Sequence, residues 1–438
     1  MSKNWQRCQL GDVLKLINGR AYKKEEMLTE GVPILRIQNL NGGNKWFYSN
    51  LDLAEDKYCY KDDLLYAWSA TFGPYWSKWD HKLIYHYHIW KIETSSVLYK
   101  QFAYYALWNI TEALKASAHG VAMPHITKAG MEAWEIDLPP LTEQKIIAEK
   151  LDTLLAQVHS TKARLEQIPQ ILKRFRQAIL TAAISGRLTD KRRKLTDLQT
   201  IWKSHTLGEL VTIDRGSSPR PIKDYITTDE DGVNWIKIGD AKEGQKYISS
   251  TKEKITKEGS KKSRKVTPGD FILSNSMSLG RAYIVEIEGY VHDGWFILRL
   301  PENIDKNYFY YLLSSSQLQT QFSSLAVGGV VQNIRSELVK QAIVNIPPLS
   351  EQHEIVRRVE QLFAYADTIE KQVNSALTRV NSLTQSILAK AFRGELTGQW
   401  RAENPDLISG ENSAAALLEK IKAERAVSSG KKAARKKE

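Results

Sequence analysis

The sequence predicts an α+β protein with a pseudo-two-fold repeat: two tandem α/β domains separated by two long α-helices that pack as an antiparallel coiled coil. Three observations support this prediction. The phrase LPPLTEQ, from Leu138, returns as IPPLSEQ, from Ile346. A heptad pattern of apolar residues follows each copy. Short runs that alternate between apolar and polar residues, as strands do, precede each copy.

The repeat extends far beyond this phrase. Residues 120–189 align with residues 328–397 without a gap. Earlier in each half the matches are weaker and their spacing drifts, as between VPILRI from Val32 and VNWIKI from Val233. The chain is therefore two half-molecules in tandem, each with a divergent first part and a near-constant second part.

Each near-constant part predicts one long helix. Two consecutive prolines precede it, Thr142 or Ser350 can cap its start, and Gly186 or Gly394 can end it. Pro169 should kink the first helix. Two apolar stripes of equal length favour packing against each other over burial in separate globular cores. The predicted seam residues are Ile147, Leu151, Leu154, Val158, Leu165, Ile168, Leu172, Phe175, Ile179, Ile355, Val359, Leu362, Ile369, Val373, Val380, Leu383 and Ile387.

These patterns divide the chain into five segments. The first domain occupies residues 1–141, and a linker with the second domain occupies 190–349. The helices occupy 142–189 and 350–397, and a C-terminal helix with a basic tail occupies 398–438. A helix of the predicted length would span roughly 60–65 Å, on the order of 18 base pairs of DNA, so it could hold the two domains a fixed distance apart.

Within the domains, alternating residues predict strands at 31–39, 86–92 and 232–240, and short helices at 98–118 and 306–324. Further strands are expected at 63–67, 270–274 and 295–300. Two basic runs, Lys191–Lys194 and the C-terminal KKAARKKE, are expected to be solvated, disordered charge.

Composition points to an anionic partner. Lys and Arg number 62 against 50 Asp and Glu, giving a formal charge of +12, although a basic tail alone could produce such an excess. Cys8 and Cys59 are the only cysteines, which excludes a disulfide framework and suits a reducing cytoplasm. We see neither an apolar run of the ~20 residues that span a membrane nor a signal peptide, so nucleic acid is the expected partner.

Known catalytic motifs are missing from the sequence. It contains no phosphate-binding loop, no glycine-rich dinucleotide fingerprint and no amino-methyltransferase motif. The run HEIVR, from His353, lacks the second His of a zinc-protease motif. His81, His86 and His88 form the one His cluster, without a nearby acidic or Cys ligand, so we expect no metal there. The sequence therefore predicts no catalytic residue and no metal site.

Basic and polar side chains recur on loops beside the predicted strands of both halves. Arg can read guanine and Asn or Gln can read adenine through paired hydrogen bonds, while cations contact phosphates. A single residue of this kind is usually a solvated loop residue; the recurrence in both halves is what favours DNA contact. In the first half the candidates are Arg20, Tyr22, Lys23, Lys24, Arg36, Gln38, Asn39, Trp68, Ser69, Thr71, His125, Thr127 and Lys128. In the second half they are Arg215, Ser217, Ser218, Arg220, Lys237, Asp240, Ser274, Asn275, Ser276, Arg281, Gln332, Asn333 and Arg335.

The tandem PPLxEQ phrase opening a long helix and the GxLT phrase closing it resemble the specificity (S) subunits of type I restriction–modification enzymes. The second helix and the tail, from EIVRRVEQLF to ALLEKIKAERA, resemble the enteric K-like (type IA) subgroup. The resemblance covers both helices, the tail and the layout of the chain, and it is weak in the two divergent domains.

The resemblance implies that each divergent domain is a target-recognition domain that reads one half of a split, asymmetric site in double-stranded DNA. It implies a non-catalytic subunit of a phage-defence complex that docks two methyltransferase (M) subunits and two restriction (R) subunits in the cytoplasm. S-adenosylmethionine, ATP and Mg would be used by those partners and not by this chain. Two rival classes are a recognition half cut from a combined restriction enzyme and a coiled-coil scaffold that binds no DNA.

Overall fold

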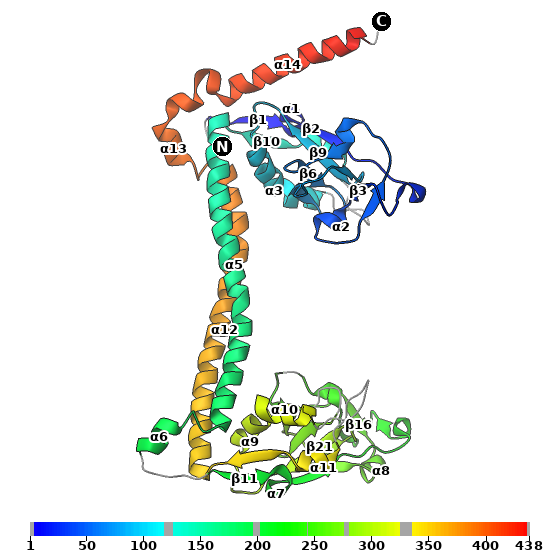
Figure 1. Cartoon of the computed structure of the whole chain (residues 1–438), viewed down its shortest axis with the longest axis vertical. Helices are drawn as coiled ribbons and strands as arrows, with labels where there is room; N and C mark the ends of the chain where they lie inside the picture. The colour runs from blue at the N-terminus through cyan, green and yellow to red at the C-terminus, as the bar shows by residue number, and fades with distance from the viewer. Residues whose placement is uncertain are drawn as a thin grey trace. The chain divides into compact units, whose positions relative to one another are not determined.

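The computed structural model describes residues 4–117, 126–195, 202–242, 244–275, 280–324 and 335–435. The chain forms two compact units, Met1–Leu165 with Ala376–Glu438, and Glu166–Ser375. Each unit contains one divergent domain and a part of both long helices (Figure 1). We describe each unit by itself.

The first divergent domain is built on two four-stranded sheets, with strand orders β2-β9-β6-β7 and β4-β3-β8-β5. Only the β3–β8 pair is parallel among the pairings of these strands, and β1 pairs with β10 in a separate ribbon. The strands are β1 (Gln6–Gln9), β2 (Leu14–Asn18), β3 (Val32–Leu35), β4 (Phe47–Ser49), β5 (Tyr58–Cys59), β6 (Leu64–Ala67), β7 (Gly73–Trp76), β8 (Leu83–Tyr85), β9 (Ile89–Thr94) and β10 (Glu135–Leu138). The helices are α1 (Leu10–Val13), η1 (Lys24–Glu26), α2 (Ile37–Leu40), η2 (Glu55–Lys57), α3 (Lys100–Ser117) and α4 (Lys128–Glu132).

The second divergent domain repeats this plan with two five-stranded sheets, β12-β21-β18-β19-β15 and β13-β16-β14-β20-β17. Its β14–β20 pair is parallel, like β3–β8, and β11 pairs with β22. The strands are β11 (Lys203–Thr206), β12 (Thr212–Arg215), β13 (Ile226–Thr227), β14 (Val233–Ile236), β15 (Tyr247–Ile248), β16 (Glu253–Ile255), β17 (Arg264–Val266), β18 (Phe271–Ser274), β19 (Ala282–Val285), β20 (Gly289–Val291), β21 (Trp295–Arg299) and β22 (Ile343–Ile346). The helices are α6 (Asp190–Leu195), α7 (Leu207–Leu210), η3 (Ile222–Asp224), η4 (Ile238–Asp240), α8 (Lys257–Ser260), α9 (Lys306–Leu313), α10 (Ser316–Ser324) and α11 (Ser336–Lys340).

The two long helices are α5 (Leu141–Ile184) and α12 (Leu349–Phe392), and α5 continues as a helix through Pro169. In the first unit the start of α5 packs against the end of α12, with Ile147 in the same core as Leu388. In the second unit the end of α5 packs against the start of α12, with Ile179 in the same core as Ile355. The helices are therefore antiparallel, and the predicted fold class is confirmed (Figure 1).

The predicted seam residues differ in how far they are buried. Those that are buried are Ile147, Leu151, Leu172, Ile179, Ile355, Val359, Val373 and Val380. Those that are partly buried are Leu154, Val158, Leu165, Ile168, Phe175, Leu362, Ile369 and Ile387. Leu383 departs from the pattern because 44% of its surface is exposed, while Leu388 and Ala391 further along α12 are buried with the first domain's core.

In each unit, residues of the two repeated phrases form a buried polar contact. In the first, Glu143 at the start of α5 is fully buried and accepts hydrogen bonds from Thr397 Oγ1 at 2.6 Å and Arg401 Nη2 at 2.7 Å. Arg401 also donates to the carbonyl of Gly394 at 2.8 Å, so it caps the end of α12. The PPLxEQ phrase of one repeat therefore contacts the GxLT phrase of the other.

The second unit repeats this contact. Glu351 at the start of α12 accepts hydrogen bonds from Thr189 Oγ1 at 2.7 Å and Arg193 Nη1 at 2.9 Å. Arg193 also donates to the carbonyl of Gly186 at 2.6 Å. The expectation that the run Lys191–Lys194 is solvated, disordered charge is wrong, because the run lies in α6. Within it, Arg193 is the charged partner of the buried Glu351.

Four local predictions also need correction. The strands predicted at 31–39 and 232–240 end early, in the helical turns α2 and η4. Asn39 Oδ1 accepts from the Arg36 N–H at 3.1 Å, and Asp240 Oδ2 accepts from the Lys237 N–H at 2.8 Å, so an Asx side chain closes each turn. The strand predicted at 86–92 begins only at Ile89, because His86 forms an isolated bridge with Arg20 and residues 87–88 form a turn. The helix predicted at 306–324 breaks into α9 and α10.

The C-terminal segment packs on the first domain. It contains α13 (Gly398–Glu403), η5 (Pro405–Ile408), η6 (Gly410–Asn412) and α14 (Ala414–Arg435). Leu418 and Ile421 of α14 lie in the core of the first unit. The helix includes the first part of the basic run that we expected to be disordered.

Candidate nucleic-acid interface

In both domains a loop passes close to the turn that follows a parallel strand, and a glycine lies at this loop crossing. The Gly216 N–H donates to the carbonyl of Trp295 at 2.8 Å, and the Gly19 N–H donates to the carbonyl of Ile89 at 3.1 Å. A Cβ atom at Gly216 would lie 2.1 Å from the carbonyl oxygen of His292, and one at Gly19 would lie 2.3 Å from that of His86. Because a side chain cannot fit, glycine places the next residues beside the turn that follows the parallel strand β20 or β8.

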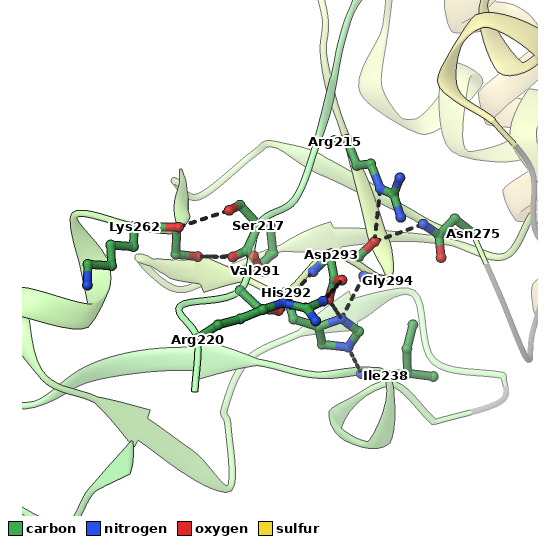
Figure 2. Close-up of polar contacts among 12 residues, drawn as sticks. Arg215, Ser217, Arg220, Ile238, Lys262, Asn275, Val291, His292, Asp293 and Gly294 are labelled. Carbon is green, nitrogen blue, oxygen red and sulfur yellow. Dashed lines mark hydrogen bonds and ion pairs between the residues drawn. The ribbon is translucent and has the colours of Figure 1, made fainter. Parts of the chain in front are cut away.

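In the second domain, polar side chains gather around Asp293 in this turn (Figure 2). Ser218 Oγ donates to Asp293 Oδ1 at 2.8 Å, and Arg220 Nη2 donates to Oδ2 at 3.1 Å. The carbonyl of Asp293 accepts from Asn275 Nδ2 at 2.9 Å and from Arg215 Nε at 3.3 Å. Four of the residues predicted to contact DNA are thus brought together by one residue that the sequence reasoning missed.

The Asp293 carboxyl is ionised in this setting. Partial burial alone would raise its pKa, but hydrogen bonds from Ser218 and the backbone, with the positive charge of Arg220, lower the pKa below its ordinary value. A sequence clue existed, because His292-Asp293-Gly294 stands where His86-Tyr87-His88 stands in the first half.

A pocket of about 770 Å³ lies beside this cluster. Its lining includes Arg220, Lys223, Lys237, His292 and Asp293. His292 lies between two backbone N–H groups, with the Ile238 nitrogen 3.1 Å from Nε2 and the Gly294 nitrogen 2.7 Å from Nδ1, and a neutral ring accepts a hydrogen bond from one of them. Burial lowers the pKa of His292, so the ring is neutral and the positive charge at this pocket comes from Arg and Lys side chains.

The other second-half candidates are distributed as follows. Ser217 donates to the carbonyl of Lys262, Lys237 pairs with Glu253 at 2.5 Å, and Asp240 closes η4. Ser274 and Asn275 are buried, so they support the loop and expose little polar surface. Arg281 and Arg335 are exposed. Ser276, Gln332 and Asn333 lie outside the described residues.

In the first domain the equivalent position holds an aromatic cluster. Arg20 makes a two-pronged ion pair with Glu26, at 3.0 and 2.6 Å, and lies 5.2 Å from the Tyr22 ring. Tyr22 is buried and stacks on His86, with centroids 6.5 Å apart. Trp68 stacks on Trp90 at 5.6 Å, so one of its faces is already covered. A DNA base could therefore stack only on the opposite face of the Trp68 ring.

The remaining first-half candidates divide by exposure. Lys23, Lys24, Gln38 and Thr71 are exposed, and Arg36 lies over Phe47 at 5.2 Å. Asn39 and Ser69 are buried, and the Asn39 amide donates to the carbonyls of Gly43 and Lys45. Thr127 caps α4 and Lys128 pairs with Glu132. His125 lies outside the described residues.

The His cluster shows no metal-binding arrangement. His86 and His88 ring centroids are 5.0 Å apart, and burial, with a smaller contribution from His88, lowers the pKa of His86 to about 4. Within the described ranges, no group of three or more His, Cys, Asp or Glu residues could hold a metal ion. In the same part of the chain, no helix is both long and apolar enough to cross a membrane.

Comparison with known proteins identifies the family. Residues 2–170 and 200–379 match the family described as type I restriction modification DNA specificity domain. The chain is 44% identical to the type I restriction enzyme EcoBI specificity subunit of Escherichia coli, over 99% of this chain and 95% of that protein. It is 41% identical to the StySPI specificity subunit of Salmonella potsdam, over 100% and 99%.

Solved structures show the same fold. A chain from a study of complex assembly and conformational transition of the type I R-M system has a TM-score of 0.68 at 18% identity, covering 90% of this chain and 99% of that one. The HsdS subunit from Thermoanaerobacter tengcongensis has a TM-score of 0.61 at 19% identity, covering 90% and 98%.

Two α/β domains joined by a pair of long helices are thus the fold that this chain shares with the solved HsdS subunit. The chain belongs to the type I restriction–modification specificity-subunit family. Its role in such a system is to confer DNA sequence specificity and not to catalyse.

Proposed function

We propose that this chain selects a bipartite, asymmetric site in double-stranded DNA, with one target-recognition domain on each half. The supporting observation is that one loop crossing carries different chemistry in the two domains. The crossing at Gly216 presents Ser218, Arg220 and Asp293. The crossing at Gly19 presents Arg20 and an aromatic cluster. The same scaffold with unlike side chains would read two unlike half-sites.

In this proposal the exposed cations supply phosphate contacts and the chain docks two M and two R subunits in the cytoplasm. Those subunits would use S-adenosylmethionine, ATP and Mg for adenine methylation and DNA cleavage, and both reactions would require this chain. The relatives are named as subunits of type I restriction enzymes, which supports the choice of partners. The five segments 1–141, 142–189, 190–349, 350–397 and 398–438 are the proposed functional divisions.

The test is to express the chain with its M subunits in cells that lack other adenine methylation and to map the methylated adenines. We expect one motif with two defined parts and an undefined gap. A matched chimera that takes residues 1–141 from a relative should change one part of the motif and leave the other intact. Methylation without sequence preference, or none in the wild-type complex, would contradict the proposal.

The paired helices are proposed to set the gap. Seven residues inserted in both α5 and α12 preserve the heptad seam and add about 10 Å, or about three base pairs. The mapped motif should keep both half-sites while its gap lengthens. A gap that stays the same in a folded, active variant would show that the helices do not measure it.

A further inference from the structure

Arg220 is an exposed guanidinium held at one end. Its side chain is 80% exposed, and Nη2 donates to Asp293 Oδ2 at 3.1 Å. A guanidinium carries five N–H donors in a fixed plane, so this single contact leaves donors that can face a ligand. The group lies on the rim of the pocket that Lys223, Lys237 and His292 also line.

Asp293 is itself fixed from several directions. Ser218 Oγ lies 2.8 Å from Oδ1 and 3.3 Å from the Asp293 N–H, so one hydroxyl holds both the carboxylate and the backbone. The Asp293 carbonyl accepts from Asn275 and Arg215 (Figure 2). A side chain paired with such a fixed carboxylate loses less entropy when it binds a ligand.

The arrangement differs from that of Arg20 in the first domain. Glu26 engages both terminal nitrogens of Arg20, at 3.0 and 2.6 Å, and only 34% of the Arg20 side chain is exposed. This ion pair occupies the fork formed by the two terminal nitrogens of Arg20. Arg220 is paired through one hydrogen of Nη2 and most of its surface lies in solvent, so one of its two forks, Nη1 with Nη2 or Nε with Nη2, stays open to a ligand.

Guanine offers two acceptors, O6 and N7, in the major groove, and a planar Arg fork matches both. We propose that Arg220 reads a guanine in the half-site of the second domain and that Asp293 is the positioning residue that holds its guanidinium for this contact. The inference rests on the proposed function, since it assigns one base pair of one half-site. A phosphate contact, by contrast, needs the charge of Arg220 but neither its fork nor its orientation.

The experiment uses the complex of this chain with its M subunits and a DNA library in which the second half-site is randomised and the first is fixed. Arg220→Lys keeps the charge and removes the fork, so it should reduce the preference for guanine at one position by tenfold or more. Asp293→Asn should lower the preference at that same position, and Asp293→Glu should restore part of it. Lys223→Ala, which removes a charge from the same pocket, should weaken binding to all sequences alike.

Several other outcomes would contradict the inference. If Arg220→Lys binds every library member as the wild type does, or if Arg220→Ala weakens all of them equally, Arg220 contacts phosphate and the inference is wrong. If Asp293→Asn changes a different position or none, its positioning role is wrong. Failure of the wild-type complex to select any motif would instead contradict the proposed function, so the two failures are separable.

Discussion

Thr397 donates a 2.6 Å hydrogen bond to the buried carboxylate of Glu143, and this contact joins the end of α12 to the start of α5. Thr189 makes the same bond to Glu351 at 2.7 Å. Each repeat therefore supplies the carboxylate to one contact and the hydroxyl to the other. We call each of these two contacts a clamp. Because each repeat contributes to both clamps, both copies carry the same residues.

Removing Arg401 tests the clamp. Arg401→Ala leaves Glu143 buried without its charged partner, and we expect a loss of about 3–5 kcal/mol in the free energy of unfolding. Chemical denaturation measures this loss. The control is Arg393→Ala, because Arg393 pairs with Glu395 at the surface and should contribute little. Equal effects of the two variants would show that the buried pair is unimportant.

The glycine crossing gives a second prediction. Gly216→Ala would place Cβ 2.1 Å from the His292 carbonyl oxygen, so the 292–294 turn must shift. We expect a loss of about 1–3 kcal/mol in the free energy of unfolding and weaker selection of the second half-site. Gly239→Ala is the matched control, since its Cβ would meet nothing within 4 Å. A wild-type denaturation curve for Gly216→Ala would refute the steric argument.

His86 predicts a pH dependence of stability. Burial lowers its pKa from 6.5 to about 4 in the folded chain. The unfolded chain therefore binds the proton first, and the His86 contribution to stability is complete above pH 6.5 and is lost as pH falls towards 4. Thermal denaturation across this range should show a flatter pH profile for His86→Gln than for the wild type. His81→Gln, at an exposed position, should keep the wild-type profile.

Salt dependence tests the phosphate contacts of the first domain. If the exposed Lys24 contacts a phosphate, Lys24→Ala should reduce the slope of log K against log salt by about 0.9 and weaken binding to all sequences alike. Lys15→Ala is the control because Lys15 pairs with Glu93 at 2.8 Å on the sheet. Binding is measured with the M-subunit complex over a range of salt concentrations. An identical slope for Lys24→Ala and wild type would remove Lys24 from the interface.

The tandem repeat and the two long helices can be predicted from the sequence alone, and the class of protein follows from the resemblance of its repeated phrases to those of the specificity subunits. Proline, cap residues and heptad spacing act over a few residues or along one helix, so they can be read without knowing which segments meet. The placement of Asn39 shows the limit of this reasoning. Its residue type suggested base reading, yet the side chain is buried and closes α2.

Which polar residues contact one another depends on how the chain folds in three dimensions. Asp293 gathers Ser218 and Arg220 from a loop 73 or more residues earlier in the chain, and Glu351 pairs with Arg193 at a separation of 158 residues. No periodicity or local motif encodes such separations. Sheet pairing sets the turns that bring those loops together, and the antiparallel packing of α5 with α12 brings the ends of each clamp within hydrogen-bonding distance.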